Sequence, residues 1–260
     1  MGVSLIISVY NDYTGLRCVL NSLLDQSDKE FEILIAHDSE DAFIQSILSS
    51  YNKQLSIRLL QQEDKGFRKN KILNKAIDQA KYLQLVFIDG DCMVHKHFIR
   101  NYARCIRQGT FCAGRRLDVD QKTAALLRTD IIKKARLFHF FKNKTKRIEE
   151  RLYAPYLPQS FLSKPKLLGC NMGWSKSDLI ALNGFDTDYM HPGFGEDSDI
   201  EWRAIKLGLK PYSMRFKAIQ FHLEHPRPNR NDLVLKGKNM MAEKVRLGEA
   251  RCDNGIIKID

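Results

Sequence analysis

The sequence has no apolar run near the roughly 20 residues that a helix needs to cross a bilayer, so we expect no membrane-spanning segment. Its six cysteines are scattered and form no C-x-x-C pair, which argues against a zinc site and a disulfide framework. The first residues lack a basic segment and a cleavage site, and we interpret them as a strand rather than a signal peptide. Internal repeats and low-complexity segments are also missing. These absences predict a folded cytoplasmic protein with reduced thiols.

Positive charge is what the sequence has in excess. There are 42 Lys and Arg against 31 Asp and Glu, which gives a formal net charge of +11. This excess favours an anionic partner, and composition leaves nucleotide phosphates, anionic lipid and nucleic acid open. A length of 260 residues with 43% hydrophobic residues is typical of one folded domain or two closely joined lobes.

Strand-like and helix-like segments alternate over the first half of the chain. The pattern predicts strands over residues 4–10, 31–38, 55–62 and 85–88, and helices over residues 14–26, 42–51 and 67–81. Thr14 is the predicted N-cap of the first helix. Such alternation is typical of an α/β fold, with a Rossmann-like, mostly parallel sheet flanked by helices.

The second half follows another pattern. It predicts a basic helix over 123–151, a loop with a short strand, two helices over 177–186 and 198–208, and a polar tail from residue 226. We therefore expect a single compact domain with two halves, 1–115 for nucleotide binding and a helical, loop-rich half, 116–260, for the acceptor and catalysis.

Polar clusters follow the predicted parallel strands, at the sheet edge where such folds bind ligands. These clusters are Tyr10-Asn11-Asp12, His37-Asp38-Ser39, Glu63-Asp64-Lys65-Gly66 and Asp89-Gly90-Asp91. In the last of them, glycine allows a tight turn that directs both carboxylates at one cation, for which oxygen ligands favour Mg²⁺ or Mn²⁺. The alternative is an ordinary Asp-Gly turn at the end of a strand.

Acidic residues and histidines of the second half add two further candidate groups. Gly193 and Gly195 flank Phe194, a platform for a sugar ring, and an acidic cluster that begins at Glu196-Asp197 offers a general base. The alternative is an acidic helix start that complements the helix dipole. The histidines of "FHLEH", His222 and His225, are either structural or a nitrogen ligand for the same metal.

Two more stretches present side chains with an open role. Lys65, Arg68, Lys69 and Lys71 lie where the third predicted strand leads into the third predicted helix. The first N–H groups of that helix can receive phosphate oxygens, and the alternative is a solvated basic face. Asn171 and Trp174 lie between two glycines in "GCNMGW". They either contact a substrate, by hydrogen bonding and stacking, or belong to the core.

These stretches together resemble glycosyltransferase family 2, inverting enzymes with the GT-A fold, and the resemblance covers nearly the whole chain. "SLIISVYNDYTGL", "FEILIAHDSED", "QEDKGFRKNKILNKAI" and "FIDGDC" are similar to its nucleotide-binding half and metal motif. The segment from "GCNMGW" to "IKLG" is similar to the galactosyltransferase-like region of chondroitin-type polymerases and β-1,4-galactosyltransferases. Two departures are visible. This chain has His37-Asp38-Ser39 where the family often has a paired Asp and a glycine, and it has Phe194-Gly195-Glu196 where the galactosyltransferases carry one additional glycine before the acids.

The resemblance implies transfer of a sugar from a nucleotide donor, with a UDP-sugar favoured, to a hydroxyl of a growing or lipid-linked saccharide. The implied context is bacterial lipopolysaccharide, capsule or other surface polysaccharide synthesis. It implies Asp197 as the base, with Glu196 beside it, and Mn²⁺ or Mg²⁺ on Asp91, Asp89 and His222. The implied nucleotide contacts are Val9, Tyr10, Asn11, Asp38, Lys65, Arg68, Asp89 and Gly90. The implied saccharide contacts are Asn171, Trp174, Phe194 and Gly195.

Two other classes of function compete with this interpretation. Much of the positive charge lies in 128–147, interleaved with Leu and Phe, which predicts peripheral contact with anionic lipid that flotation with liposomes can test. Nucleic acid is disfavoured as the partner because no recognised binding motif accompanies the charge. A nucleotidyltransferase would also need carboxylates and basic groups, but it would release pyrophosphate instead of a nucleoside diphosphate.

Overall fold

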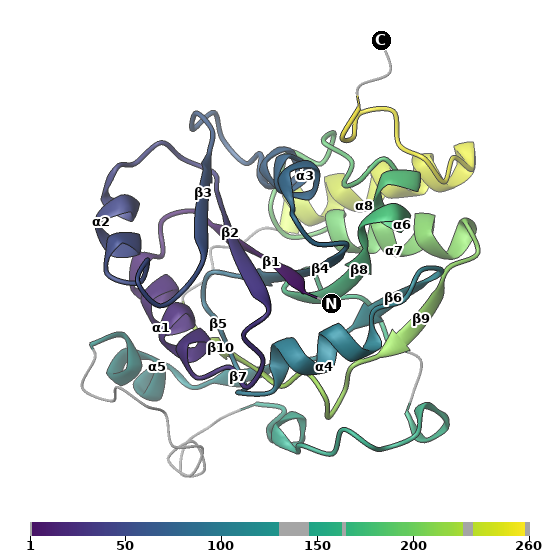
Figure 1. Ribbon diagram of the computed structural model, residues 1–260. Helices are drawn as coiled ribbons and strands as arrows, with labels where there is room; N and C mark the ends of the chain where they lie inside the picture. The colour runs from purple at the N-terminus through teal and green to yellow at the C-terminus, as the bar shows by residue number, and fades with distance from the viewer. Residues whose placement is uncertain (1, 130–145, 163–164, 226–230, 258–260) are drawn as a thin grey trace.

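A computed structural model describes residues 2–129, 146–162, 165–225 and 231–257, and its centre is a twisted sheet (Figure 1). The sheet has seven strands in the order β3-β2-β1-β4-β8-β6-β9. β1 (Val3–Val9), β2 (Phe31–His37), β3 (Ile57–Gln61) and β4 (Gln84–Asp89) are parallel. β8 (Asn171–Ser175) pairs antiparallel with β4 and with β6 (Thr110–Ala113), and β9 (Lys210–Ser213) is parallel to β6.

Helices cover both faces of this sheet. Side chains of α1 (Tyr13–Leu24), α2 (Phe43–Ser49) and α4 (Phe98–Cys105) pack in the core on one face. Those of α3 (Lys69–Gln79), α6 (Lys176–Ala181) and α7 (Glu196–Lys206) pack on the other. The remaining described helices are α5 (Gln121–Arg128), α8 (Asn231–Leu247) and the short 3₁₀ helices η2 (Ile148–Arg151) and η3 (Gln159–Phe161).

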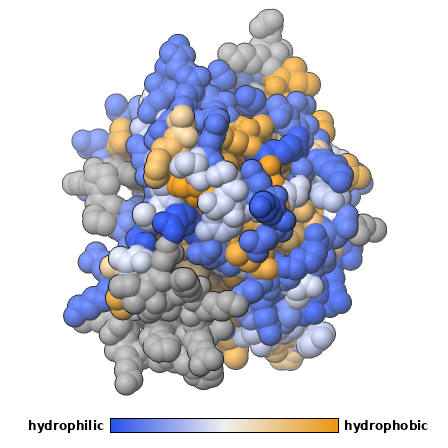
Figure 2. Space-filling model, turned by 60° about the vertical axis from the view of Figure 1, so that its left-hand side comes forward, coloured by the Kyte–Doolittle hydropathy of each residue, from blue (hydrophilic) through white to orange (hydrophobic). Residues whose placement is uncertain are grey.

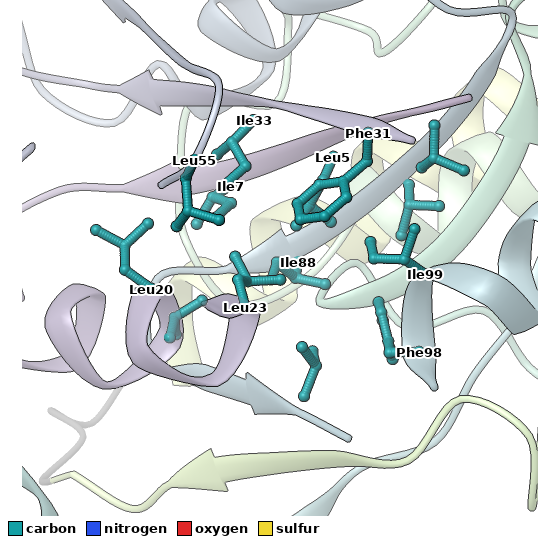
Figure 3. Close-up of a cluster of buried hydrophobic side chains, with 14 of the residues drawn as sticks. Leu5, Ile7, Leu20, Leu23, Phe31, Ile33, Leu55, Ile88, Phe98 and Ile99 are labelled. Atoms are coloured by element: carbon teal, nitrogen blue, oxygen red, sulfur yellow. The ribbon is translucent and has the colours of Figure 1, made fainter. Parts of the chain in front are cut away.

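The strands are apolar on both faces because successive side chains point in opposite directions and both directions lead into a core. Leu5 and Ile7 of β1 pack toward α1 together with Ile88 of β4 (Figure 3), whereas Ile6 and Phe87 pack toward α3. All of these side chains are at most 1% exposed. The buried runs of β1 and β4 therefore hold the polar residues that follow them at one rim of the sheet.

A second, three-stranded sheet lies beside that rim. Its order is β5-β10-β7, formed by β5 (Cys92–Val94), β10 (Gln220–Leu223) and β7 (Leu117–Val119). In its register His222 lies opposite Cys92 on one side and Asp118 on the other. This pairing carries a histidine from the far end of the chain to the residues that follow β4.

The predicted α/β class with a mostly parallel, helix-flanked sheet is confirmed, but several local predictions are wrong. Asp12, not Thr14, caps α1, because its carboxylate accepts the Gly15 N–H at 2.8 Å. The predicted helix over 123–151 ends at Arg128 in α5, and the chain returns at Lys146 as a bridge to Asp118 before η2. Most of the basic 128–147 segment lies outside the described residues.

The second half is richer in strands and helices than its sequence indicates. β8 and β9 extend the same sheet as the first half, so the second half is more than helices and loops. The predicted polar tail contains α8, a helix of 17 residues. The division at residue 115 stays a prediction.

The described residues on the face of the protein shown in Figure 2 form no large continuous hydrophobic area, in agreement with a sequence that lacks long apolar runs. On the face shown in Figure 2, hydrophobic patches are interspersed among hydrophilic residues. Within the described ranges, no helix combines the length and the hydropathy that crossing a bilayer requires.

Candidate active site

A cavity of about 1180 Å³ opens at the carboxyl ends of β1, β2 and β4. Residues of the second sheet, α3, α5 and the start of α7 form its other walls. Ten of the predicted site residues line it, namely Val9, Tyr10, Asn11, Asp38, Asp89, Gly90, Asp91, Glu196, Asp197 and His222. Residues more than two hundred positions apart in the sequence thus share one cavity.

Asp38 is held in place at the end of β2. One carboxylate oxygen accepts the Gln62 amide at 2.5 Å, and the other accepts the Arg68 backbone N–H at 2.8 Å. The preceding His37 is fully buried and contacts the Tyr13 hydroxyl and the Tyr10 carbonyl oxygen. Asp38 is therefore the member of this pair that can meet a ligand.

The turn after β4 packs closely against the end of β1. The Gly90 N–H donates to the Ser8 carbonyl at 2.8 Å, and a Cβ on Gly90 would lie 3.1 Å from a Val9 methyl carbon. Glycine is favoured here because a side chain would push β1 and the turn apart. The Asp89 carboxylate accepts the Ser8 hydroxyl at 2.7 Å and forms an ion pair with Lys69 at 2.9 Å.

Lys69 is the one of the four basic residues at the start of the third helix whose side chain lines the cavity. It starts α3, and its ammonium group is largely buried between acidic groups. Burial opposes its charge, but the nearby Asp89 and Glu196 outweigh this and raise the pKa of Lys69. A fixed positive charge of this kind is suited to phosphate oxygens.

Asp91, His222 and His225 converge on one point, with their ligand atoms all within 4.8 Å of one another. His222 Nε2 and His225 Nε2 each lie 3.3 Å from Asp91 Oδ2, and His222 Nδ1 lies 3.1 Å from Asp118 Oδ1. Burial disfavours protonated His222, but the hydrogen bonds to Asp118 and Asp91 outweigh it and raise the pKa of His222 to about 9. Burial also disfavours ionised Asp91, and the bonds from both histidines outweigh it and lower the pKa of Asp91.

This cluster fits a divalent cation. A carboxylate and two imidazoles form a mixed O/N donor set that suits Mn²⁺, and a carboxylate behind the histidine is a common outer partner of metal ligands. Asp89 does not belong to this cluster and faces Lys69 instead, so its place among the ligands stays a prediction. His225, the second histidine of "FHLEH", lies in the cluster together with Asp91 and His222.

Glu196 and Asp197 form the first turn of α7. Asp197 Oδ1 accepts the Ser198 backbone N–H at 2.8 Å, and Oδ2 accepts the Gly169 N–H at 3.3 Å. These two bonds hold the Asp197 carboxylate in one orientation. Burial, with a contribution from Asp197, raises the pKa of Glu196 despite the opposing charge of Lys69.

The structure corrects the predicted saccharide contacts. Trp174 is fully buried and stacks on Phe111 with ring centroids 5.2 Å apart, so it belongs to the core. The buried Asn171 amide donates to backbone carbonyls and accepts the Tyr102 hydroxyl at 2.6 Å. Pro192 and Gly193 line the cavity, whereas Phe194 and Gly195 are not among its lining residues.

Two predicted phosphate contacts also lie elsewhere. Lys65 is exposed and pairs with Glu63 at 2.7 Å. The Arg68 guanidinium group donates to the Glu63 carbonyl, so Arg68 contributes its backbone N–H, to Asp38. The arginines that do line the cavity are Arg116 and Arg128.

Comparison with known proteins identifies the family of this chain. The model of the family Glycosyl transferase family 2 matches residues 4–157, and that of the N-terminal domain of galactosyltransferase matches residues 158–226. Chondroitin synthase of Escherichia coli is 22% identical over 261 residues, which cover 93% of this chain and 38% of that protein. Hyaluronan synthase of Pasteurella multocida is 26% identical over 103 residues, 39% of this chain and 11% of the synthase. The chain therefore spans well under half the length of these relatives.

Solved structures show the same fold. Staphylococcus aureus TarS in complex with UDP has a TM-score of 0.65 at 19% identity, covering 94% of this chain and 65% of that chain. Mannosyltransferase PcManGT from Pyrobaculum calidifontis, in complex with GDP-Man and Mn²⁺, has a TM-score of 0.63 at 14% identity, covering 94% and 64%. Since the first family model covers more than half of the chain, the protein belongs to glycosyl transferase family 2 and is a glycosyltransferase with the GT-A fold.

Proposed function

We propose that this glycosyltransferase is inverting and metal-dependent and moves a sugar from a UDP donor to a saccharide hydroxyl. The observation that carries the proposal is that one cavity contains both an oriented carboxylate, Asp197, and the Asp91–His222–His225 cluster. The first can accept a proton from the acceptor, and the second can hold a cation beside the departing diphosphate. These are the two requirements of a direct displacement at an activated sugar.

Asp38 is the proposed contact for the nucleobase of the donor. Its carboxylate can accept an N–H from uracil while Gln62 and the Arg68 backbone hold it in place. Among similar structures, TarS is described in complex with UDP and with UDP-GlcNAc, and PcManGT with GDP-Man. We choose UDP because TarS is described with UDP and UDP-GlcNAc and because the Asp38 carboxylate can accept the uracil N–H.

In the proposed mechanism, Asp91, His222 and His225 would hold Mn²⁺ or Mg²⁺, which supplies charge stabilisation for the leaving diphosphate. Lys69 adds a fixed positive charge, neutralising diphosphate charge as the bond to the sugar breaks. Asp197 takes the proton of the acceptor hydroxyl while the hydroxyl oxygen attacks the anomeric carbon from the face opposite the departing diphosphate. One displacement of this kind inverts the anomeric configuration.

The proposed acceptor is a growing or lipid-linked saccharide of a bacterial surface polysaccharide, such as lipopolysaccharide or capsule. Chondroitin and hyaluronan synthases among the relatives make this class the natural choice. A cytoplasmic location with peripheral contact of residues 128–147 to anionic membrane remains part of the proposal, and salt-sensitive flotation with anionic liposomes tests it.

Product analysis tests the proposed reaction. With a panel of nucleotide sugars and Mn²⁺, we expect UDP to be released from one UDP-sugar, slowly without acceptor and faster with a suitable oligosaccharide. NMR of the product should show an inverted anomeric centre. Release of pyrophosphate would instead identify a nucleotidyltransferase, and a retained anomeric configuration would exclude the single displacement.

Lys69→Met is expected to weaken UDP binding by about tenfold or more, because a buried charge-assisted contact to phosphate is lost. Lys71→Met is the matched control, since Lys71 is exposed on the same helix. Lys69→Arg should restore most of the affinity. Isothermal titration with UDP in the presence of Mn²⁺ measures all three variants, and equal affinities for Lys69→Met and Lys71→Met would contradict the assignment.

A further inference from the structure

Helix α8 follows residue 226, the last residue that either family model matches, and its backbone contacts the loop before α7. Figure 1 shows α8 on the side of the molecule where α6 and α7 lie. Gly237 is the one buried residue in the described part of α8, and every other position there is exposed or half-buried. A helix with so small a buried face has contacts that can be followed one by one.

The first contact joins α8 to the end of the loop before α7. A Cβ on Gly237 would lie 2.5 Å from the Phe194 carbonyl oxygen and 3.2 Å from the carbonyl carbon. The helix backbone therefore touches the loop backbone directly, and Lys238 places its ammonium group 5.9 Å from the centre of the Phe194 ring. Gly195 follows with φ of 131°, with the Tyr189 ring against it, and α7 then begins with Glu196.

The second contact joins α8 to the start of the same loop. Lys244 Nζ lies 2.6 Å from Asp186 Oδ2 and 2.8 Å from Asp188 Oδ2. Asp186 is 1% exposed as a side chain, so this bond is shielded from solvent. The segment after α8 adds to it, because the Asn254 amide donates to Asp188 Oδ1 at 2.9 Å and the Thr187 N–H donates to the Asn254 carbonyl at 2.7 Å.

We infer that α8 is a clamp that fixes both ends of the loop 186–195 and so sets the position of Asp197. Gly237 and Lys244 are then positioning residues that act through the loop without touching substrate. The inference rests on the proposed role of Asp197 as the base. A displacement of the Asp197 carboxylate by about 1 Å would impair proton removal from the acceptor. It would leave the distant contact between Asp38 and the uracil of the donor unchanged.

Gly237→Ala separates this role from a purely structural one. Alanine favours a helix more than glycine does, so α8 by itself should become more stable. The clamp predicts the opposite for catalysis, because the added methyl group must push the Phe194 carbonyl away. We expect acceptor transfer to fall by about tenfold while UDP affinity stays within about twofold of the wild type. Asn239→Ala, at an exposed position of α8, is the matched control.

Lys244→Met tests the other end of the loop, with Lys244→Arg as the rescue and Lys236→Met as the exposed control. Hydrogen exchange of peptides covering 186–197 provides a readout that does not depend on activity. Faster exchange in Gly237→Ala and Lys244→Met, with slower transfer, supports the clamp. If the wild type transfers no sugar but exchange still rises in both variants, the clamp stands and the proposed function fails. Unchanged exchange in both variants would overturn the clamp.

Discussion

Asp197→Asn should lower the rate of sugar transfer by about 10³-fold, because an amide cannot take the proton of the acceptor hydroxyl. The substitution keeps the shape of the side chain, and its oxygen can still accept the Ser198 backbone N–H. UDP affinity with Mn²⁺ should stay within about twofold, since the Asp38 and Asp91 contacts are unchanged. Initial rates at saturating donor, with titration of UDP, give both quantities.

Two comparisons make this result specific. Asp253→Asn removes an exposed carboxylate and should leave the rate unchanged. Glu196→Gln, next to the proposed base, should cost only about tenfold, because Glu196 acts on its neighbours through charge. If Glu196→Gln proves far more damaging than Asp197→Asn, the base is the first acid of the pair.

Local patterns predicted the rim of the cavity correctly because the relevant signals are local. The buried runs that lead to Asp38 and Asp89 lie in β2 and β4, which pair in parallel with β1 on its two sides, so both residues lie at the same rim of the sheet. Their chemical environments were not predictable in this way. Lys69 and Lys71 look alike in the sequence, and only Asp89 and Glu196, distant along the chain, distinguish the first.

Errors in the second half have a related cause. The run "NMGWS" was too short to identify as a central strand, yet β8 is inserted between β4 and β6. That long-range pairing buries Asn171 and Trp174, which a local pattern left open to substrate. Helix α8 was not predicted because Gly237 is the one buried residue in its described part, and a single buried position does not produce an apolar stripe in the sequence.

Asp91→Asn should abolish Mn²⁺ binding, whereas Asp89→Asn should leave much of it intact. The reason is that Asp91 lies between His222 and His225, while Asp89 is paired with Lys69. His222→Gln should resemble Asp91→Asn, and Asp118→Asn should weaken Mn²⁺ by about tenfold to a hundredfold through the loss of support behind His222. His191→Gln, at an exposed histidine, is the control. Electron paramagnetic resonance of Mn²⁺ measures binding without any donor sugar.

The same variants connect the cation to the nucleotide. If the cation lies between the cluster and the diphosphate, EDTA and Asp91→Asn should each raise the dissociation constant of UDP by about a hundredfold, and together no further than either alone. Additive losses would mean that Asp91 contacts the nucleotide by another route. Mn²⁺ binding that survives Asp91→Asn but is lost in Asp89→Asn would place the cation beside Lys69, where a buried ammonium group already compensates the carboxylate.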